Sequence, residues 1–97
     1  MRSTKVTESI IRSEKRCVEG DTYEYRLTVS EGRSTSNYRI LLYSIEVDFH
    51  GADGNSTNGR INEAFADPGR AIIFYERLVN NLATPLDLPY VLEDSIK

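Results

Sequence analysis

The sequence predicts an α+β protein, in which an antiparallel sheet of about four strands in meander order carries two C-terminal helices on one face. Two stretches, 22–30 and 38–50, alternate apolar and polar residues with a period of two, which is typical of strands with one buried face. A later stretch, 68–82, repeats its apolar residues at the helical period. The chain of 97 residues has the size of a single domain, so these elements should share one core.

The first two strands are expected at about 4–17 and 22–30. The earlier one is β-branched and polar, and its alternation is the weaker of the two. The later one turns its aromatic and aliphatic residues to one side and its polar residues to the other. The apolar set is Tyr23, Tyr25, Leu27 and Val29. The turn between the two strands falls at residues 19–21, which include a glycine.

The third and fourth strands are expected at 38–50 and 60–66. The apolar face of the third strand holds Leu41, Tyr43, Ile45, Val47 and Phe49. Near its start the opposite face is apolar as well, because Tyr38, Ile40 and Leu42 lie there. Either the strand is central at that point or a bulge switches its faces, and something should cover the patch.

The helices follow the sheet. The long one is expected at 68–82, with Asp67 as N-cap and Pro68 in the first helical position. Its inner arc contains Ala71, Ile72, Phe74, Tyr75, Leu78, Val79 and Leu82. Ile73 falls on the outer side, and Pro85 stops the helix. A short second helix is expected at 89–96, with an inner stripe of Leu88, Val91, Leu92 and Ile96.

The stretch 50–60 holds the single histidine and three of the six glycines, and we interpret it as the hairpin loop between the third and fourth strands. The alternative is a site for a cation or small molecule, built from Asp48, His50 and Asp53. A calcium helix-loop-helix places Gly at position 6 of twelve and oxygen ligands at positions 1, 3 and 12. Aligning Gly54 to position 6 puts Phe49, Gly51 and Arg60 at those ligand positions, which argues against calcium.

Composition and charge narrow the range of functions and cellular locations to be expected of this chain. A net charge of −3 argues against binding nucleic acid. The lone Cys17 points to a reducing compartment, and neither a signal peptide nor a membrane-spanning run is visible, so a cytoplasmic location without a membrane partner is expected. A zinc site needs three or four ligands, and the single histidine favours neither a metal site nor a catalytic triad. We therefore expect no cofactor and no enzyme activity.

The tail "ATPLDLPYVLEDSI" resembles the C-terminal signature of a small uncharacterised bacterial family, a domain of unknown function found mainly in clostridia and their relatives. The matching residues are Thr84, Pro85, Leu88, Val91, Glu93, Asp94 and Ile96. The order of strands and helices is also similar, whereas Pro89 and the long 50–60 loop depart from the family pattern. The resemblance implies a cytoplasmic bacterial protein, and it brings no activity, substrate or catalytic residue.

The leading functional hypothesis is a small non-catalytic protein that acts by protein–protein interaction or self-association. One layer of helices covers one face of a sheet, and monomers rarely leave large apolar patches open. We therefore expect a homodimer formed through a sheet face or a sheet edge. The residues expected at the interaction surface are Tyr38, Ile40, Leu42 and Ile73. The alternative hypothesis is binding of a small molecule or cation by the strand-end loops around 48–60.

Overall fold

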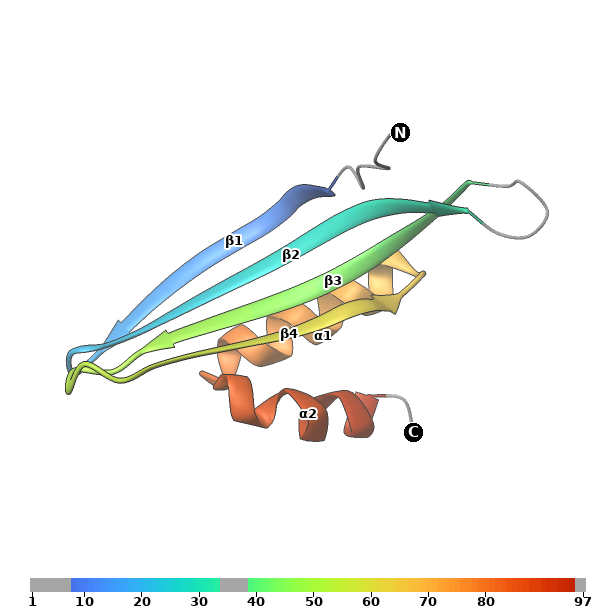
Figure 1. Ribbon diagram of the computed structural model, residues 1–97. Helices are drawn as coiled ribbons and strands as arrows, with labels where there is room; N and C mark the ends of the chain where they lie inside the picture. Colours follow the sequence, from blue (N-terminus) through green and yellow to red (C-terminus); the bar gives the residue numbers. More distant parts are fainter. Residues whose placement is uncertain (1–7, 34–38, 96–97) are drawn as a thin grey trace.

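The computed structural model describes residues 8–33 and 39–95 and shows the predicted α+β architecture (Figure 1). One antiparallel sheet has the strand order β1-β2-β3-β4, and the helices lie together on one of its faces. The strands are β1 (Glu8–Val18), β2 (Asp21–Arg33), β3 (Arg39–His50) and β4 (Ser56–Phe65). The helical elements are α1 (Pro68–Asn80), the short 3-10 helix η1 (Pro85–Asp87) and α2 (Leu88–Ser95). The meander and the two C-terminal helices are thereby confirmed.

The largest difference from the expected boundaries is at β4, which begins at Ser56 and not near residue 60. The polar residues before 60 continue the ladder, with Ser56 opposite His50 and Asn58 opposite Asp48. Only residues 51–55 form the loop, so the glycine and asparagine content of the stretch overstated its length. The expected residues 4–7 of the first strand, and Tyr38, lie outside the described residues.

Gly59 has a role in β4 that differs from the turn expected for it. An added Cβ at this position would lie 2.9 Å from both the Leu88 Cδ1 and the Pro85 Cβ atoms. The missing side chain therefore lets η1 and the start of α2 pack directly on the strand. This contact holds the C-terminal segment against the sheet.

The core lies between the helices and one sheet face. Four side chains of the central strands are completely buried there: Tyr25, Leu27, Ile45 and Val47. They pack against the inner arc of α1, of which Ala71, Phe74, Tyr75, Leu78 and Val79 are buried. Leu41 was expected on this buried face, but it is 51% exposed. The reason is that β4 pairs with β3 only as far as Tyr43, and the ends of β2 and β3 extend past the helices (Figure 1).

Two tyrosine hydroxyls link the layers through hydrogen bonds. The Tyr25 hydroxyl donates to the carbonyl of Ala83 at 2.8 Å, and the Tyr75 hydroxyl donates to the carbonyl of Tyr25 at 3.3 Å. Both rings are fully buried. Burial, more than the neighbouring charges, raises the pKa of Tyr75 to about 12 and raises that of Tyr25 further.

The ends of α1 follow from local chemistry. The Asp67 side chain accepts a hydrogen bond from the Gly69 amide, and Pro68 occupies the first turn, as predicted. At the other end, Leu82 has a φ of +50°, and the Ala83 amide donates to the Leu78 carbonyl at 3.0 Å. This Schellman closure ends the helix at Asn80, two residues before the expected end.

The second helix begins at Leu88, one residue before the expected start. Leu88 is buried, and Val91 and Leu92 pack against the core, as the apolar stripe predicted, whereas Ile96 lies outside the described residues. Within 8–33 and 39–95, neither α1 nor α2 has the length and apolar character that crossing a bilayer requires.

Candidate functional site on the open face of the sheet

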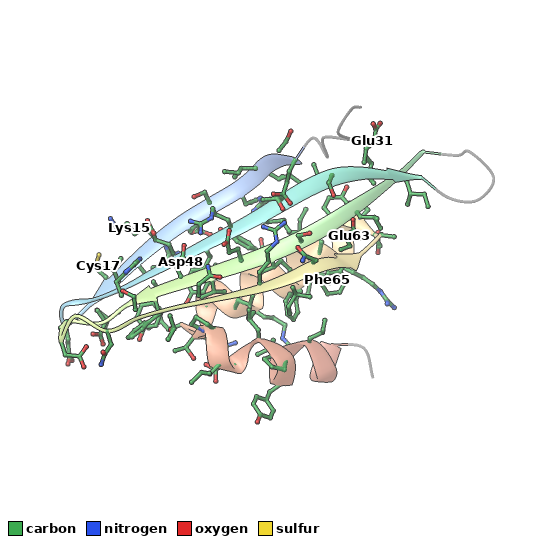
Figure 2. The ribbon with its side chains drawn as sticks, in the orientation of Figure 1. Lys15, Cys17, Glu31, Asp48, Glu63 and Phe65 are labelled. Atoms are coloured by element: carbon green, nitrogen blue, oxygen red, sulfur yellow. The ribbon has the colours of Figure 1, made fainter. Side chains whose placement is uncertain are left out.

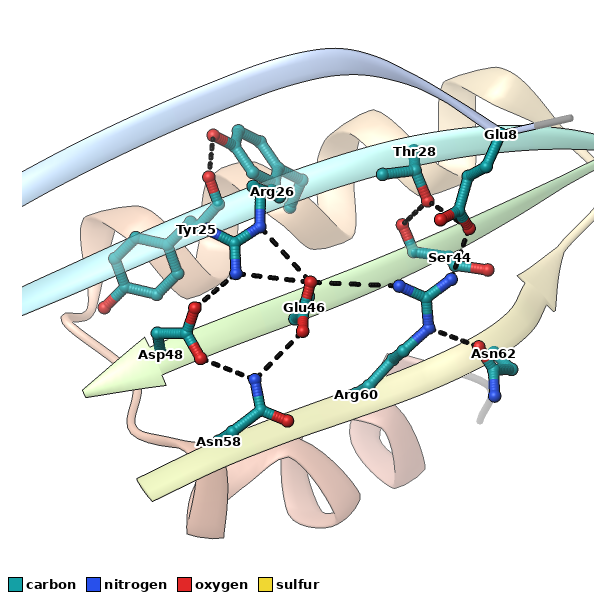
Figure 3. A network of polar contacts seen from close by, with 11 residues as sticks. Glu8, Tyr25, Arg26, Thr28, Ser44, Glu46, Asp48, Asn58, Arg60 and Asn62 are labelled. Carbon is teal, nitrogen blue, oxygen red and sulfur yellow. Dashed lines mark hydrogen bonds and ion pairs between the residues drawn. The ribbon is translucent and has the colours of Figure 1, made fainter. Parts of the chain in front are cut away.

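The sheet face away from the helices carries a connected set of polar side chains (Figure 3). Its first part is centred on Arg26 of β2. The Arg26 Nε donates to a Glu46 carboxylate oxygen at 3.2 Å, and its terminal nitrogen forms an ion pair with Asp48. The side-chain amide of Asn58, on β4, donates hydrogen bonds to the carboxylates of Glu46 and Asp48. Strand register produces this arrangement, since Arg26 pairs with Glu46 and Asp48 pairs with Asn58.

Its second part is centred on Arg60 of β4. Arg60 forms an ion pair with Glu8 of β1, donates to the Asn62 side chain, and lies 3.8 Å from the Glu46 carboxylate. The same Glu8 oxygen accepts a hydrogen bond from the Thr28 hydroxyl at 3.1 Å. Glu46 therefore joins the two arginines, and the network reaches from β1 to β4.

Small hydroxyl side chains are buried beneath these long ones. Thr28, Ser30 and Ser44 are at most 4% exposed, although the described helices all lie on the other face of the sheet. The Ser44 hydroxyl accepts a hydrogen bond from the Glu63 amide at 2.9 Å. Glu63 has a φ of +51° at the irregularity where β4 departs from regular pairing with β3. The bulge therefore fixes the chain at one end of the network.

A pocket of about 380 Å³ opens at this end. It is lined by Glu8, Ser30, Ser44, Arg60, Asn62 and Glu63. The Ser30 hydroxyl makes no hydrogen bond within the described residues, in contrast to those of Thr28 and Ser44. All four strands contribute to the lining, so the pocket depends on the meander order.

The network shifts the pKa values of its members. Burial raises the pKa of Asp48, but the hydrogen bonds from Asn58 and Arg26 outweigh it and hold this pKa below its usual value. The hydrogen bond to Asp48 likewise raises the pKa of Arg26. Both groups therefore stay charged at neutral pH and act as fixed partners.

The residues of the alternative loop site are not gathered into one site. Asp48 is held by Arg26 and Asn58, whereas Asp53 accepts hydrogen bonds from the backbone and side chain of Asn55 within the turn. The His50 Nδ1 lies 3.0 Å from the Ser56 hydroxyl. Within the described residues, no three His, Cys, Asp or Glu side chains group so that they could hold a metal.

The expected interaction residues that the structure describes lie on two different surfaces. Ile40 and Leu42 are half-buried on the open face of β3. Ile73 is 61% exposed on α1, which packs on the opposite face. Tyr38 lies outside the described residues. The patch expected at the start of β3 is therefore small within the part of the chain that the structure describes.

Sequence reasoning missed the network, although the polar halves of the alternating strands were visible. Arg26, Glu46 and Asp48 alternate with the apolar residues of their strands, and the period of two predicts only that they lie on the side away from the core. Their pairing requires the register, because the Arg60–Glu8 contact joins residues 52 positions apart. The one available signal was that both charge signs occur on the polar side of consecutive strands.

Comparisons with protein-family models, curated proteins and solved structures give no match to this chain. The resemblance of the tail to the clostridial family therefore stays a prediction.

Proposed function

We propose that this is a small non-catalytic intracellular bacterial protein that acts by self-association, with β1 pairing antiparallel to β1 of a second copy. The observation that carries the proposal is the exposure of this strand. Every β1 side chain except Glu14 is exposed, and the 11-residue strand has a neighbour on one side only. Such an edge offers a row of backbone donors and acceptors to another strand.

The two edges of the sheet differ in how they are covered. On β4, η1 and α2 pack close to the strand at Gly59. On β1, the described link to the helical layer is an exposed ion pair between Arg12 and Glu76 at 3.6 Å. Lys15 and Cys17 project from this outer strand (Figure 2). The edge of β1 is therefore the more accessible of the two.

The charges of β1 favour one register with a second copy. Arg12 and Glu14 lie on the same face, because they pair with Leu27 and Tyr25 of β2. Antiparallel pairing centred on Ser13 places Arg12 of each copy opposite Glu14 of the other, which forms two symmetric ion pairs. Centring the pair on Glu14 or Lys15 instead places two like charges directly opposite each other, which is destabilising.

The edge is also a better interface than the open face. Association through the open face would bury five charged side chains that are now partly hydrated, namely Glu8, Arg26, Glu46, Asp48 and Arg60. Removing such groups from water is costly even when they are paired. Edge pairing leaves the network in contact with solvent and extends the sheet from four strands to eight.

Sedimentation equilibrium at micromolar concentration tests the proposal, with charge-reversal variants as controls. We expect a dimer for the unchanged chain and weaker dimers for Arg12→Glu and Glu14→Arg, because each change opposes like charges. The double variant should dimerise again, since it restores the attraction with its direction reversed. A strict monomer, or a dimer that tolerates both single changes, would contradict pairing in this register.

Cross-linking defines the register independently. In a Cys17→Ser background, Ser13→Cys should form a disulfide-linked dimer on mild oxidation, because two opposed residues lie about 4.5–5.5 Å apart at Cα, within the range of a disulfide. Lys15→Cys is the matched control and should link poorly. Efficient linking through position 15 alone would move the centre of the interface and refute the proposed one.

A further inference from the structure

The pocket beside Glu63 has features that the β1 interface does not use. Its walls come from four strands: Glu8 from β1, Ser30 from β2, Ser44 from β3, and Arg60, Asn62 and Glu63 from β4. Glu63 lies at the end of β4 that leads into α1 (Figure 2). Every residue that lines the pocket is polar or charged, so the pocket suits a small ligand with a hydrophilic group.

Several acceptors in the pocket are not satisfied by the protein. The Ser30 hydroxyl is in a residue only 4% exposed, and it has no hydrogen-bond partner among the described residues. The Glu63 carboxylate likewise takes part in no hydrogen bond or ion pair within the described part of the chain. Glu8 uses only one carboxylate oxygen, the one that contacts Thr28 and Arg60. Among the described residues no buried side-chain oxygen lacks a hydrogen-bond partner, so the Ser30 oxygen is reached by solvent at the pocket, where a ligand could take the place of water.

The charge balance of the pocket selects the sign of the ligand. Two carboxylates, Glu8 and Glu63, face one guanidinium, Arg60. That guanidinium already contacts Glu8, Glu46 and Asn62, so little of its charge is available to an incoming anion. The pocket is therefore electronegative, and it attracts a cation.

The backbone at Glu63 supports a built site. A non-glycine residue with φ of +51° is strained by about 1–2 kcal/mol relative to its ordinary conformations. The hydrogen bond from the Glu63 amide to the Ser44 hydroxyl, at 2.9 Å, holds the residue there. The backbone of Glu63 is therefore fixed beside the pocket that this residue lines, and strained backbone conformations cluster at binding sites.

We propose that this pocket binds a small organic cation through an ammonium or guanidinium group. An ammonium offers three N–H donors and a guanidinium five, and both lack acceptors. They match the unused oxygens of Glu63, Glu8 and Ser30. The pocket has no aromatic residue in its lining and a volume of about 380 Å³, which limits the ligand to a short aliphatic amine or guanidine.

The test uses the full chain and four matched probes: n-butylammonium, n-butylguanidinium, n-butanol and butyrate, at equal ionic strength. Backbone amide shifts of residues around Ser30, Ser44 and Glu63 should move and saturate with the two cations. The melting temperature should rise with them as well, because they bind only the native state. The neutral alcohol and the anion should produce neither effect.

Variants locate the binding. Glu63→Gln and Ser30→Ala should each weaken cation binding, by about tenfold for the loss of one charge-assisted contact. Glu24→Gln, which removes a carboxylate on the same face but outside the pocket, should leave it unchanged. Circular dichroism verifies that each variant is folded. The proposal is overturned if the cations cause no saturable shift up to roughly 50 mM, if the alcohol or butyrate matches them, or if Glu63→Gln binds as well as the unchanged chain.

Discussion

The two faces of the sheet are made by the same strands but are stabilised in different ways. Towards the helices, Leu27 and Ile45 are completely buried among apolar neighbours. One residue further along each strand, Thr28 and Glu46 belong to a polar network open to solvent. On the helix side, the apolar side chains of the strands are buried by the apolar side chains of the helices. On the open side, charged side chains form ion pairs with one another and cover the small residues Thr28, Ser30 and Ser44.

This difference shows where stability and binding are located in the molecule. Apolar burial contributes about 25 cal/mol per Å² and needs no exact partner. An exposed or half-exposed ion pair contributes about 0–1 kcal/mol, because solvent screens it and ordering long side chains costs entropy. The helix face should therefore dominate folding, whereas the open face should determine what the surface can recognise.

The largest effect is expected from a truncation on the helix face. Leu27→Ala should lower the free energy of unfolding by about 2–5 kcal/mol, because it leaves a cavity beneath α1. Its neighbour Thr28→Ala should cost only about 0.5–1.5 kcal/mol, the value of a lost hydrogen bond. Urea denaturation measures both. Equal losses at the two positions would mean that the faces do not differ as described.

Alkaline pH should weaken the helix face specifically. The pKa of Tyr75 is raised by burial from 10.0 to about 12 in the folded state, so the folded chain holds this proton more tightly than the unfolded chain. The stabilisation is complete below pH 10 and is lost as the pH rises through about 12. The free energy of unfolding should fall by about 2 kcal/mol over this pH range. Tyr75→Phe should make the unfolding free energy less dependent on pH in this range, and an unchanged dependence would contradict the assignment.

Filling the close contact at Gly59 should also destabilise the chain. Gly59→Ala places a methyl group within 2.9 Å of Leu88 and Pro85, so the C-terminal segment must move. We expect a loss of about 1–3 kcal/mol. Gly69→Ala is the control, since an added Cβ there meets nothing closer than 3.8 Å and alanine favours a helix. A neutral result at position 59 would show that α2 is not held against β4.

A smaller effect is expected on the open face. Arg26→Met leaves Glu46 and Asp48 without their shared cation and should cost about 1–2 kcal/mol, discounted because all three side chains are about a quarter exposed. The pKa of Asp48 should rise in this variant, which NMR titration can follow. Lys15→Met, on the exposed edge, should change stability by less than about 0.5 kcal/mol. If the two substitutions cost the same, the network contributes no more than an ordinary surface.

The sequence predicted the helix face well, because that face follows from periodicity alone. Alternation identified Tyr25 and Val47 as core, and the 100° arc identified Phe74 and Leu78. The early start of β4 was missed because Asn58 and Gly59 resemble turn residues. Their places depend on partners in β3 and η1 that no local pattern reveals.

The open face could be predicted only in outline. Its residues were recognised as polar, but the pairing of Arg60 with Glu8 depends on four strands lying in register. The unpartnered Ser30 hydroxyl is visible only once the neighbouring strands are placed. Pairings between distant residues carry no periodic signal, so this part of the molecule had to come from the structure.

Thiol labelling of single-cysteine variants tests the two-faced sheet most directly. In a Cys17→Ser background, cysteine would be placed in turn at the four successive positions Ile45, Glu46, Val47 and Asp48. We expect labelling at 46 and 48 in the native state, and protection at 45 and 47 until the chain unfolds. Equal labelling at all four positions, or protection at 46 and 48 together with reactivity at 45 and 47, would contradict the account.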